Sequence, residues 1–193
     1  MSTEKHPFEP FLPQGARFLF LGSFPPPAAR WSMPFYYPNW INDFWRIMGL
    51  IHYGDKDRFC IVGGKRFDET AIREFCSREG LAFYDTACEV RRLRGNASDA
   101  FLEVVTPTDI PALLERIPEC KALVTTGQKA TEVIAECFGC AVPQIGGSVE
   151  TDIAGRSIRF WRMPSTSRAY PLPLPQKAEY YRQLWKGVQS LDL

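Results

Sequence analysis

The alternation of short apolar runs with amphipathic segments is the feature of this sequence that most constrains its fold. Short apolar runs typical of buried strands lie at 17–21, 81–86 and 122–125. Apolar residues at helical spacing predict helices at 40–51, 68–78, 127–138 and 176–189, and a further helix that starts at Thr108 or Asp109 and ends at 117. Strands that alternate with helices favour a parallel sheet covered by helices on both faces.

The remaining segments complete this outline. Two runs, 149–153 and 157–161, flank an Ala154-Gly155 turn and predict a hairpin or an edge element. The stretch 89–107 is expected to be mostly irregular. The length of 193 residues fits one domain, 1–193, in which 1–15 forms an extended N-terminal segment.

Composition and charge exclude some classes of protein. No apolar run has the length that a signal peptide or a membrane span needs, so we expect a cytoplasmic protein that does not bind membranes. The net charge of +1 does not by itself indicate a nucleic-acid binder. Seven basic residues and one acid lie between 155 and 187, and this stretch is either a phosphate-binding face or an ordinary solvated surface.

Two loops stand out because each directly follows a predicted strand. One is Gly22-Ser23-Phe24-Pro25-Pro26-Pro27 and the other is Met163-Pro164-Ser165-Thr166-Ser167-Arg168. Ligands of parallel α/β sheets bind beyond the carboxyl ends of the strands. The sequence therefore predicts that these distant segments meet at one rim and form a site.

The first loop leads into aromatic and amide side chains. Phe35, Tyr36 and Tyr37 offer flat surfaces on which a base could stack, although each could equally cover the core. Asn39 is placed to cap the following helix. Asn42 falls inside that predicted helix, where asparagine is a mediocre former, so another reason for its presence is expected.

The second loop combines hydroxyls with a cation. Ser165, Thr166, Ser167 and Arg168 suit a phosphate, because short donors approach the oxygens and the guanidinium supplies charge. The alternative is a Ser/Thr turn whose hydroxyls bond to the backbone of the loop itself.

Several kinds of chemistry lack their sequence signals. The six cysteines are typical of buried small side chains, and the Cys137/Cys140 pair has no second pair at metal-binding spacing, so we expect neither metal nor cofactor. The phosphate-loop, dinucleotide and nucleophile-elbow motifs are absent from the sequence. His6 is assigned to the tail and His52 to a helix end, so we expect neither a histidine-centred triad nor a histidine metal site.

Five segments, in order along most of the chain, resemble the uracil-DNA glycosylase superfamily, and most closely its hypoxanthine-DNA glycosylase and mismatch-specific uracil-DNA glycosylase branches. These segments are LGSFP at 21–25, YYPNWINDFW at 36–45, YDTACEVRR at 84–92, GQKA at 127–130 and MPSTS at 163–167. The resemblance implies a three-layer α/β/α sandwich with a central, mainly parallel four-stranded sheet. It also implies a monomeric DNA-repair enzyme that hydrolyses the N-glycosidic bond of a deaminated base, uracil or hypoxanthine, after flipping it from the DNA.

The resemblance also assigns roles to residues. Asn42 would be catalytic and would position a water against the sugar C1′ atom. The base pocket would comprise Gly22, Ser23, Phe24, Pro25 and Tyr37. Contacts to DNA phosphates and the inserted strand would come from Pro164, Ser165, Thr166, Ser167 and Arg168.

Two positions depart from the family pattern. Phe24 stands where many members carry an acid or asparagine that activates water, and Met163 stands where some carry a histidine that stabilises the departing base. Two other functions therefore stay open, namely a DNA-binding protein with weak or no catalysis and a hydrolase of small nucleosides or nucleotides. The preferred base, the choice between double- and single-stranded DNA and the role of Gly63-Gly64-Lys65-Arg66 are left open by the sequence.

Overall fold

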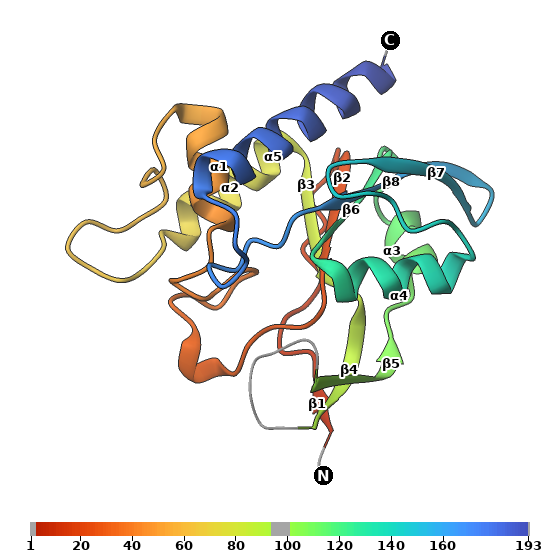
Figure 1. Cartoon of the computed structure of the whole chain (residues 1–193), viewed down its shortest axis with the longest axis horizontal. Coiled ribbons are helices and arrows are strands. Elements are labelled where there is room, and N and C mark those ends of the chain that lie inside the picture. The colour runs from red at the N-terminus through yellow and green to blue at the C-terminus, as the bar shows by residue number, and fades with distance from the viewer. Residues whose placement is uncertain (1–2, 94–100, 193) are drawn as a thin grey trace.

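A five-stranded sheet forms the centre of the protein, which is described by a computed structural model over residues 3–93 and 101–192. Its strands run in the order β3-β2-β6-β8-β7 (Figure 1). The bounds are β2 Phe18–Gly22, β3 Leu81–Asp85, β6 Ala122–Thr126, β7 Ser148–Ile153 and β8 Arg156–Met163. β2 pairs in parallel with β3 and β6, and β6 pairs in parallel with β8.

The expected mainly parallel sheet is confirmed, with five strands in place of four. The fifth strand is β7, which pairs antiparallel with β8 and lies at the edge. The hairpin predicted around Ala154-Gly155 is therefore present, and both turn residues have positive φ. β8 pairs antiparallel with β7 in the hairpin and in parallel with β6. Because β8 therefore runs in the same direction as β2, the loop after Met163 and the loop after Gly22 begin at the same carboxyl edge of the sheet.

Helices cover both faces of this sheet, which gives the predicted three layers. In Figure 1, α1, α2 and α5 lie on one side of the strands, and α3 and α4 lie on the other. The bounds are α1 Phe44–Tyr53, α2 Glu69–Glu79, α3 Ile110–Glu115, α4 Gln128–Phe138 and α5 Leu174–Gln189. Short 3-10 turns lie at Ala28–Arg30 and Ser190–Asp192.

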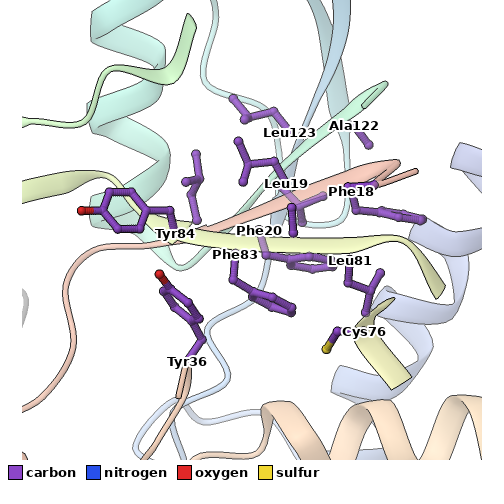
Figure 2. Packing of buried hydrophobic residues seen from close by; sticks show 14 of the residues in the cluster. Phe18, Leu19, Phe20, Tyr36, Cys76, Leu81, Phe83, Tyr84, Ala122 and Leu123 are labelled. Carbon is purple, nitrogen blue, oxygen red and sulfur yellow. The ribbon is translucent and has the colours of Figure 1, made fainter. Parts of the chain in front are cut away.

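The core is rich in aromatic side chains on one face of the sheet. Figure 2 shows Phe20 and Phe83 on one side of β2 and β3, and Leu19 and Leu123 on the opposite side. The rings of Phe20 and Phe83 stack with centroids 5.5 Å apart, and both side chains are fully buried. Because the central strands are buried on both faces, they appear in the sequence as continuous apolar runs.

The prediction of a mostly irregular 89–107 segment is wrong for the part that the structure describes. β4 Ala87–Arg92 and β5 Leu102–Pro107 pair antiparallel, and β1 Glu4–Lys5 adds to β4. The register of β4 shifts between Ala87 and Val90, so the apolar alternation that marks a strand is interrupted. Residues 94–100 lie outside the described residues.

Helix α1 begins four residues later than its apolar spacing predicts. Asp43, not Asn39, is its N-cap residue, and the Asn39 side chain instead accepts a hydrogen bond from the Ile41 amide at 3.1 Å. Residues 40–42 therefore form a turn ahead of the helix. This correction places Asn42 outside the helix and beside the rim of the sheet.

The N-terminal segment runs antiparallel along the edge strand β3. It contains β1, and Phe11 makes an isolated antiparallel bridge with Phe83 of β3. Residues 1–2 lie outside the described residues. Within the described ranges, no helix has both the length and the apolar character needed to cross a lipid bilayer.

Candidate active site

A pocket of about 590 Å³ opens at the carboxyl edge of the parallel strands. The end of β2 contributes Gly22, the end of β3 contributes Asp85, and the end of β6 contributes Thr126. The two loops predicted from the sequence supply much of the remaining wall. A pocket of this size falls in the range that small-molecule and cofactor sites occupy.

The structure brings nine of the eleven predicted site residues around this one pocket. They are Gly22, Ser23, Phe24, Pro25, Tyr37, Asn42, Ser165, Thr166 and Ser167. The lining does not include the other two, Pro164 and Arg168. The Pro164 carbonyl instead accepts a hydrogen bond from the buried Tyr181 hydroxyl at 3.1 Å, which anchors the second loop to α5.

Asn42 is held at the junction of the two loops. Its Oδ1 accepts a hydrogen bond from the Phe44 amide at 2.9 Å, so the side chain satisfies a free N–H at the start of α1. The prediction that Asn42 falls inside the helix is therefore wrong, because the residue lies before the helix and its side chain bonds to the first helical N–H. Its backbone forms an antiparallel bridge with Ser167. The Nδ2 group is a donor, and the second lone pair of Oδ1 can still accept.

Tyr37 forms a fixed aromatic wall. Its ring stacks on Phe44 with centroids 3.9 Å apart and an interplanar angle of 3°, so only the opposite face can meet a ligand. Its hydroxyl lies 2.8 Å from the Thr126 Oγ1 atom. Burial raises the pKa of Tyr37, and the nearby Asp85 carboxylate adds to the rise, so the hydroxyl stays protonated. The residue adopts a positive φ of 51°, a backbone conformation that is uncommon outside glycine.

A buried group of charges fastens the two loops together behind the pocket. The Asp43 carboxylate lies 3.0 Å from Lys177 Nζ and 3.1 Å from Arg168 Nε. Lys177 has 1% of its side chain exposed and also donates to the Ser167 carbonyl at 2.8 Å. The Asp43 amide donates to the Thr166 carbonyl at 2.8 Å. Together these bonds fix Asn42 and Ser167 beside each other.

The same contacts explain much of the basic stretch between 155 and 187. Lys177 and Arg168 pair with Asp43, and Arg156 donates to the carbonyls of Leu114, Pro118 and Cys120. Three of the seven cations therefore have structural contacts, and the buried Lys177 fits neither a phosphate-binding face nor a solvated surface. Arg168 still has 46% of its side chain exposed, so it can also reach a ligand at the rim.

The hydroxyls of the second loop form local turns without losing their donor capacity. Ser165 Oγ accepts from the Ser167 amide and Ser167 Oγ accepts from the Ala169 amide, both at 3.2 Å. The turn that the sequence left as an alternative is therefore present. Because each oxygen acts as an acceptor there, each hydroxyl hydrogen can be donated to a ligand. Thr166 is 2% exposed and is tied to Asp43 through its backbone.

Two functional candidates were missed by sequence reasoning, namely Asp85 and His6. Asp85 Oδ1 accepts from the Gly22 amide at 3.1 Å, and Oδ2 lies 2.9 Å from His6 Nε2. The expectation that His6 lies in a free tail is wrong, because its side chain is 2% exposed and packs against the Tyr84 ring at 4.4 Å. A carboxylate at the carboxyl end of a predicted strand, on the ligand rim, was the signal that could have identified Asp85.

Arg30 is a third residue that the sequence did not single out. It is exposed and lines the pocket from the 3-10 turn after the first loop. It provides a guanidinium at the pocket mouth, where Arg168 does not line the wall.

The cysteines and the 63–66 loop lie apart from this pocket. The packing explanation of the C-x-x-C pair holds only for Cys140, because Cys137 is exposed. Among the described residues, no group of three or more candidate ligands could hold a metal. Gly63-Gly64-Lys65-Arg66 is the exposed part of a loop closed by the isolated bridge between Cys60 and Phe67.

Comparison with known proteins supports the fold. No protein-family model and no curated protein matches the chain. A solution NMR structure from Methanosarcina acetivorans, described as a "putative Uracil DNA glycosylase", matches with a TM-score of 0.65 and 18% sequence identity. The match covers 97% of this chain and 99% of that chain. The fold is therefore like that of this solved structure over its whole length.

Proposed function

We propose that this chain is a DNA N-glycosylase of the uracil-DNA glycosylase superfamily, acting as a single domain on a deaminated base. The observation that carries the proposal is the single pocket that joins the two motif loops, with Tyr37, Asn42 and the Ser165 loop around it. The fold supports the same assignment through its likeness to the solved archaeal structure.

The geometry suggests how such a reaction would proceed. A flipped base would enter the pocket, and extrusion costs a few kcal/mol, least for a mispaired base. The free face of Tyr37 would stack on it, since Phe44 covers the other face. Backbone amides around Phe24 would bind a base carbonyl. Ser165 and Ser167 would donate their hydroxyls to phosphates on the strand.

Asn42 would then hold the attacking water against the sugar. Its Oδ1 is partly used by the Phe44 amide, which fixes the orientation of the whole amide group. An amide is a weak base, so the gain in rate comes from positioning and from stabilising the leaving base. The clasp of Asp43, Lys177 and Arg168 holds this side chain beside the phosphate-binding loop.

A panel of oligonucleotides tests the proposal. Uracil or hypoxanthine is placed opposite each base and in single strands, and alkali cleaves any abasic product. We expect excision by the parent and a loss of about 100-fold or more in Asn42→Ala, the size of effect that removing one positioning or stabilising group has. Asn39→Ala is the matched control, since the Asn39 side chain bonds to the Ile41 amide and, although the residue also lines the pocket, no role in holding the water is assigned to it. Absence of product from every oligonucleotide at enzyme excess contradicts the proposal.

A second candidate is a DNA-binding protein of this fold without base release. It is favoured by Met163, which is fully buried and gives no side chain to the pocket, and by Phe24, which cannot activate water. Salt-dependent DNA binding without excision, unchanged in Asn42→Ala, selects this candidate. Faster cleavage of a free nucleoside than of an oligonucleotide selects instead a small-nucleoside hydrolase.

A further inference from the structure

The pocket contains a carboxylate whose direction is fixed by a histidine from the far N-terminal segment. Asp85 and His6 are 79 positions apart, and their Oδ2 and Nε2 atoms lie 2.9 Å from each other. Asp85 lines the pocket, whereas the His6 ring lies behind it with 2% of its side chain exposed. The pair is therefore built into the wall, with only the carboxylate facing the ligand.

We infer that His6 is a positioning residue that holds Asp85 as a fixed hydrogen-bond acceptor for the ring N–H of the base in the pocket. The inference rests on the proposed glycosylase function and names the chemical group by which that site recognises its substrate. Asp85 would touch the base, and His6 would act only through Asp85.

Two backbone groups of Phe8 face the other ring nitrogen of His6. The Phe8 amide lies 3.1 Å from Nδ1, and the Phe8 carbonyl oxygen lies 2.9 Å from it. When the amide donates to Nδ1, the hydrogen of the neutral ring is on Nε2. The inference requires this arrangement, in which Nε2 donates to Asp85.

The carboxylate keeps capacity for a ligand after its two protein contacts. The Gly22 amide bonds Oδ1 at 3.1 Å and His6 bonds Oδ2. A carboxylate offers about four lone-pair positions, so roughly two remain for the pocket side. These lone pairs can only accept hydrogen bonds. The Gly22 amide and His6 hold the carboxylate of Asp85 from behind and prevent it from rotating away from the pocket.

An acceptor of this kind matches what deamination does to a base. Cytosine and adenine present a ring nitrogen with a lone pair on the pairing edge, and uracil, hypoxanthine and xanthine present a ring N–H at the same place. A fixed acceptor binds that N–H. Against cytosine or adenine, the same acceptor faces the lone pair of the ring nitrogen, and the two lone pairs repel. Thymine and guanine also carry a ring N–H, so the contact does not exclude them, and pocket shape and duplex pairing must do so.

Single-turnover excision kinetics on uracil and hypoxanthine oligonucleotides test the inference. Asp85→Asn replaces one carboxylate oxygen with an amide NH2 donor and removes the charge. We expect the excision rate to fall by about 100-fold, the scale of a lost charged hydrogen bond. His6→Phe keeps an aromatic ring beside Tyr84 but removes the donor, and we expect a fall of about 10-fold with an unchanged half-saturating enzyme concentration.

A rescue variant and a control separate positioning from packing. His6→Gln places an amide N–H near the site of Nε2, and we expect it to recover most of the rate lost in His6→Phe. His52→Phe is the matched control, because the other histidine of the chain lies in the last turn of α1, away from the pocket at the first turn. Heteronuclear NMR of the parent adds a readout that needs no variant, and His6 is expected to carry its hydrogen on Nε2.

The outcomes distinguish this inference from the proposed function. Excision by the parent with unchanged rates in Asp85→Asn and His6→Phe overturns the inference and leaves the function standing. Equal losses in His6→Phe and His6→Gln show a packing role and overturn it as well, as does a parent ring with its hydrogen on Nδ1 alone. No excision by the parent overturns the proposed function, and the inference falls with it.

Discussion

Two buried aspartates, Asp43 and Asp85, hold parts of the pocket in place and serve it differently. Asp43 is enclosed by Lys177 and Arg168 and does not line the pocket. Asp85 is bonded by the neutral Gly22 amide and by His6, and it faces the pocket. Their exposed fractions are almost equal, at 6% and 7%.

The difference shows that burial alone does not tell a structural carboxylate from a functional one. Both oxygens of Asp43 are paired with cations, Arg168 and Lys177, and so serve to join the two loops. Asp85 is bonded on the side away from the pocket, so its remaining lone pairs can accept from a ligand. Variants should therefore affect mainly stability at Asp43 and mainly catalysis at Asp85.

The largest expected effect is on stability, from Lys177→Met. Breaking a buried ion pair by removing one partner costs about 3–5 kcal/mol, because the remaining charge is left poorly compensated. Arg168 stays on Asp43 and is half exposed, so we expect the lower part of that range. Urea unfolding at neutral pH measures the loss.

Asp85→Asn is the matched comparison for this measurement. The amide can keep the bond from the Gly22 N–H, so we expect a loss under about 1.5 kcal/mol, the scale of one ordinary hydrogen bond. Equal losses at the two sites would remove the distinction between a structural and a functional aspartate.

The next effect is on catalysis, from Gly22→Ala. A Cβ atom at Gly22 would lie 2.7 Å from Asp85 Oδ1, so the carboxylate must move. Overpacking of this kind costs about 1–3 kcal/mol, and we expect a 10- to 100-fold slower excision as Asp85 leaves its place. Gly64→Ala is the control, because the nearest atom to its Cβ is 3.9 Å away. Normal rates in Gly22→Ala would show that the position of Asp85 does not matter.

The sequence predicted the central fold well because burial on both faces leaves a clear signal. Strands β2, β3 and β6 are continuous apolar runs, and α2, α3 and α4 follow a cap residue or a glycine. The strand β4 was missed because its register shifts break the two-residue period. The start of α1 was misplaced because Trp40 and Ile41 continue the helical spacing although they belong to a turn.

The parts of the site that depend on neighbouring residues could be predicted, and the contacts between distant residues could not. The two loops were predicted because each follows a strand and carries its own motif. The pairing of His6 with Asp85 joins residues 79 positions apart, and the clasp of Lys177 with Asp43 joins residues 134 apart. No periodicity or spacing along the chain encodes such contacts, and only the folded topology brings these side chains together.

A smaller effect is expected from Tyr37→Phe, which tests the burial of the Tyr37 hydroxyl. At pH 7 we expect a loss of about 0.5–1.5 kcal/mol, from the hydrogen bond between the Tyr37 hydroxyl and Thr126. Burial, with the Asp85 charge added, raises the pKa of Tyr37 in the folded protein. A raised pKa gives stability that is complete below the unfolded value and is lost as pH rises above it.

The difference between parent and Tyr37→Phe should therefore shrink above pH 10, the ordinary pKa of tyrosine. For each pH unit above 10, the unfolding free energy of the parent falls by about 1.4 kcal/mol, because Tyr37 ionises only in the unfolded chain. The variant has no hydroxyl at this position and does not lose this stability. Urea unfolding at pH 7 and at pH 11 measures this. Thr126→Val is the control, since it removes the same bond and retains the titrating hydroxyl. A constant difference across this pH range would contradict the raised pKa.

The smallest expected effect compares Arg168, which is paired with Asp43, with Arg30, which lies at the pocket mouth. Each phosphate contact contributes about 0.9 to the slope of log affinity against log salt for duplex DNA. We expect Arg30→Ala to lower this slope by about 1, because Arg30 is exposed on the pocket wall. We expect a smaller change in Arg168→Ala, because the Arg168 Nε is bonded to Asp43 and only the Nη donors remain for a phosphate. Fluorescence anisotropy with a duplex oligonucleotide at several salt concentrations measures both slopes. A full unit lost in Arg168→Ala and none in Arg30→Ala would mean that Asp43 orients Arg168 toward the DNA, and that the carboxylate assigned to structure also serves binding.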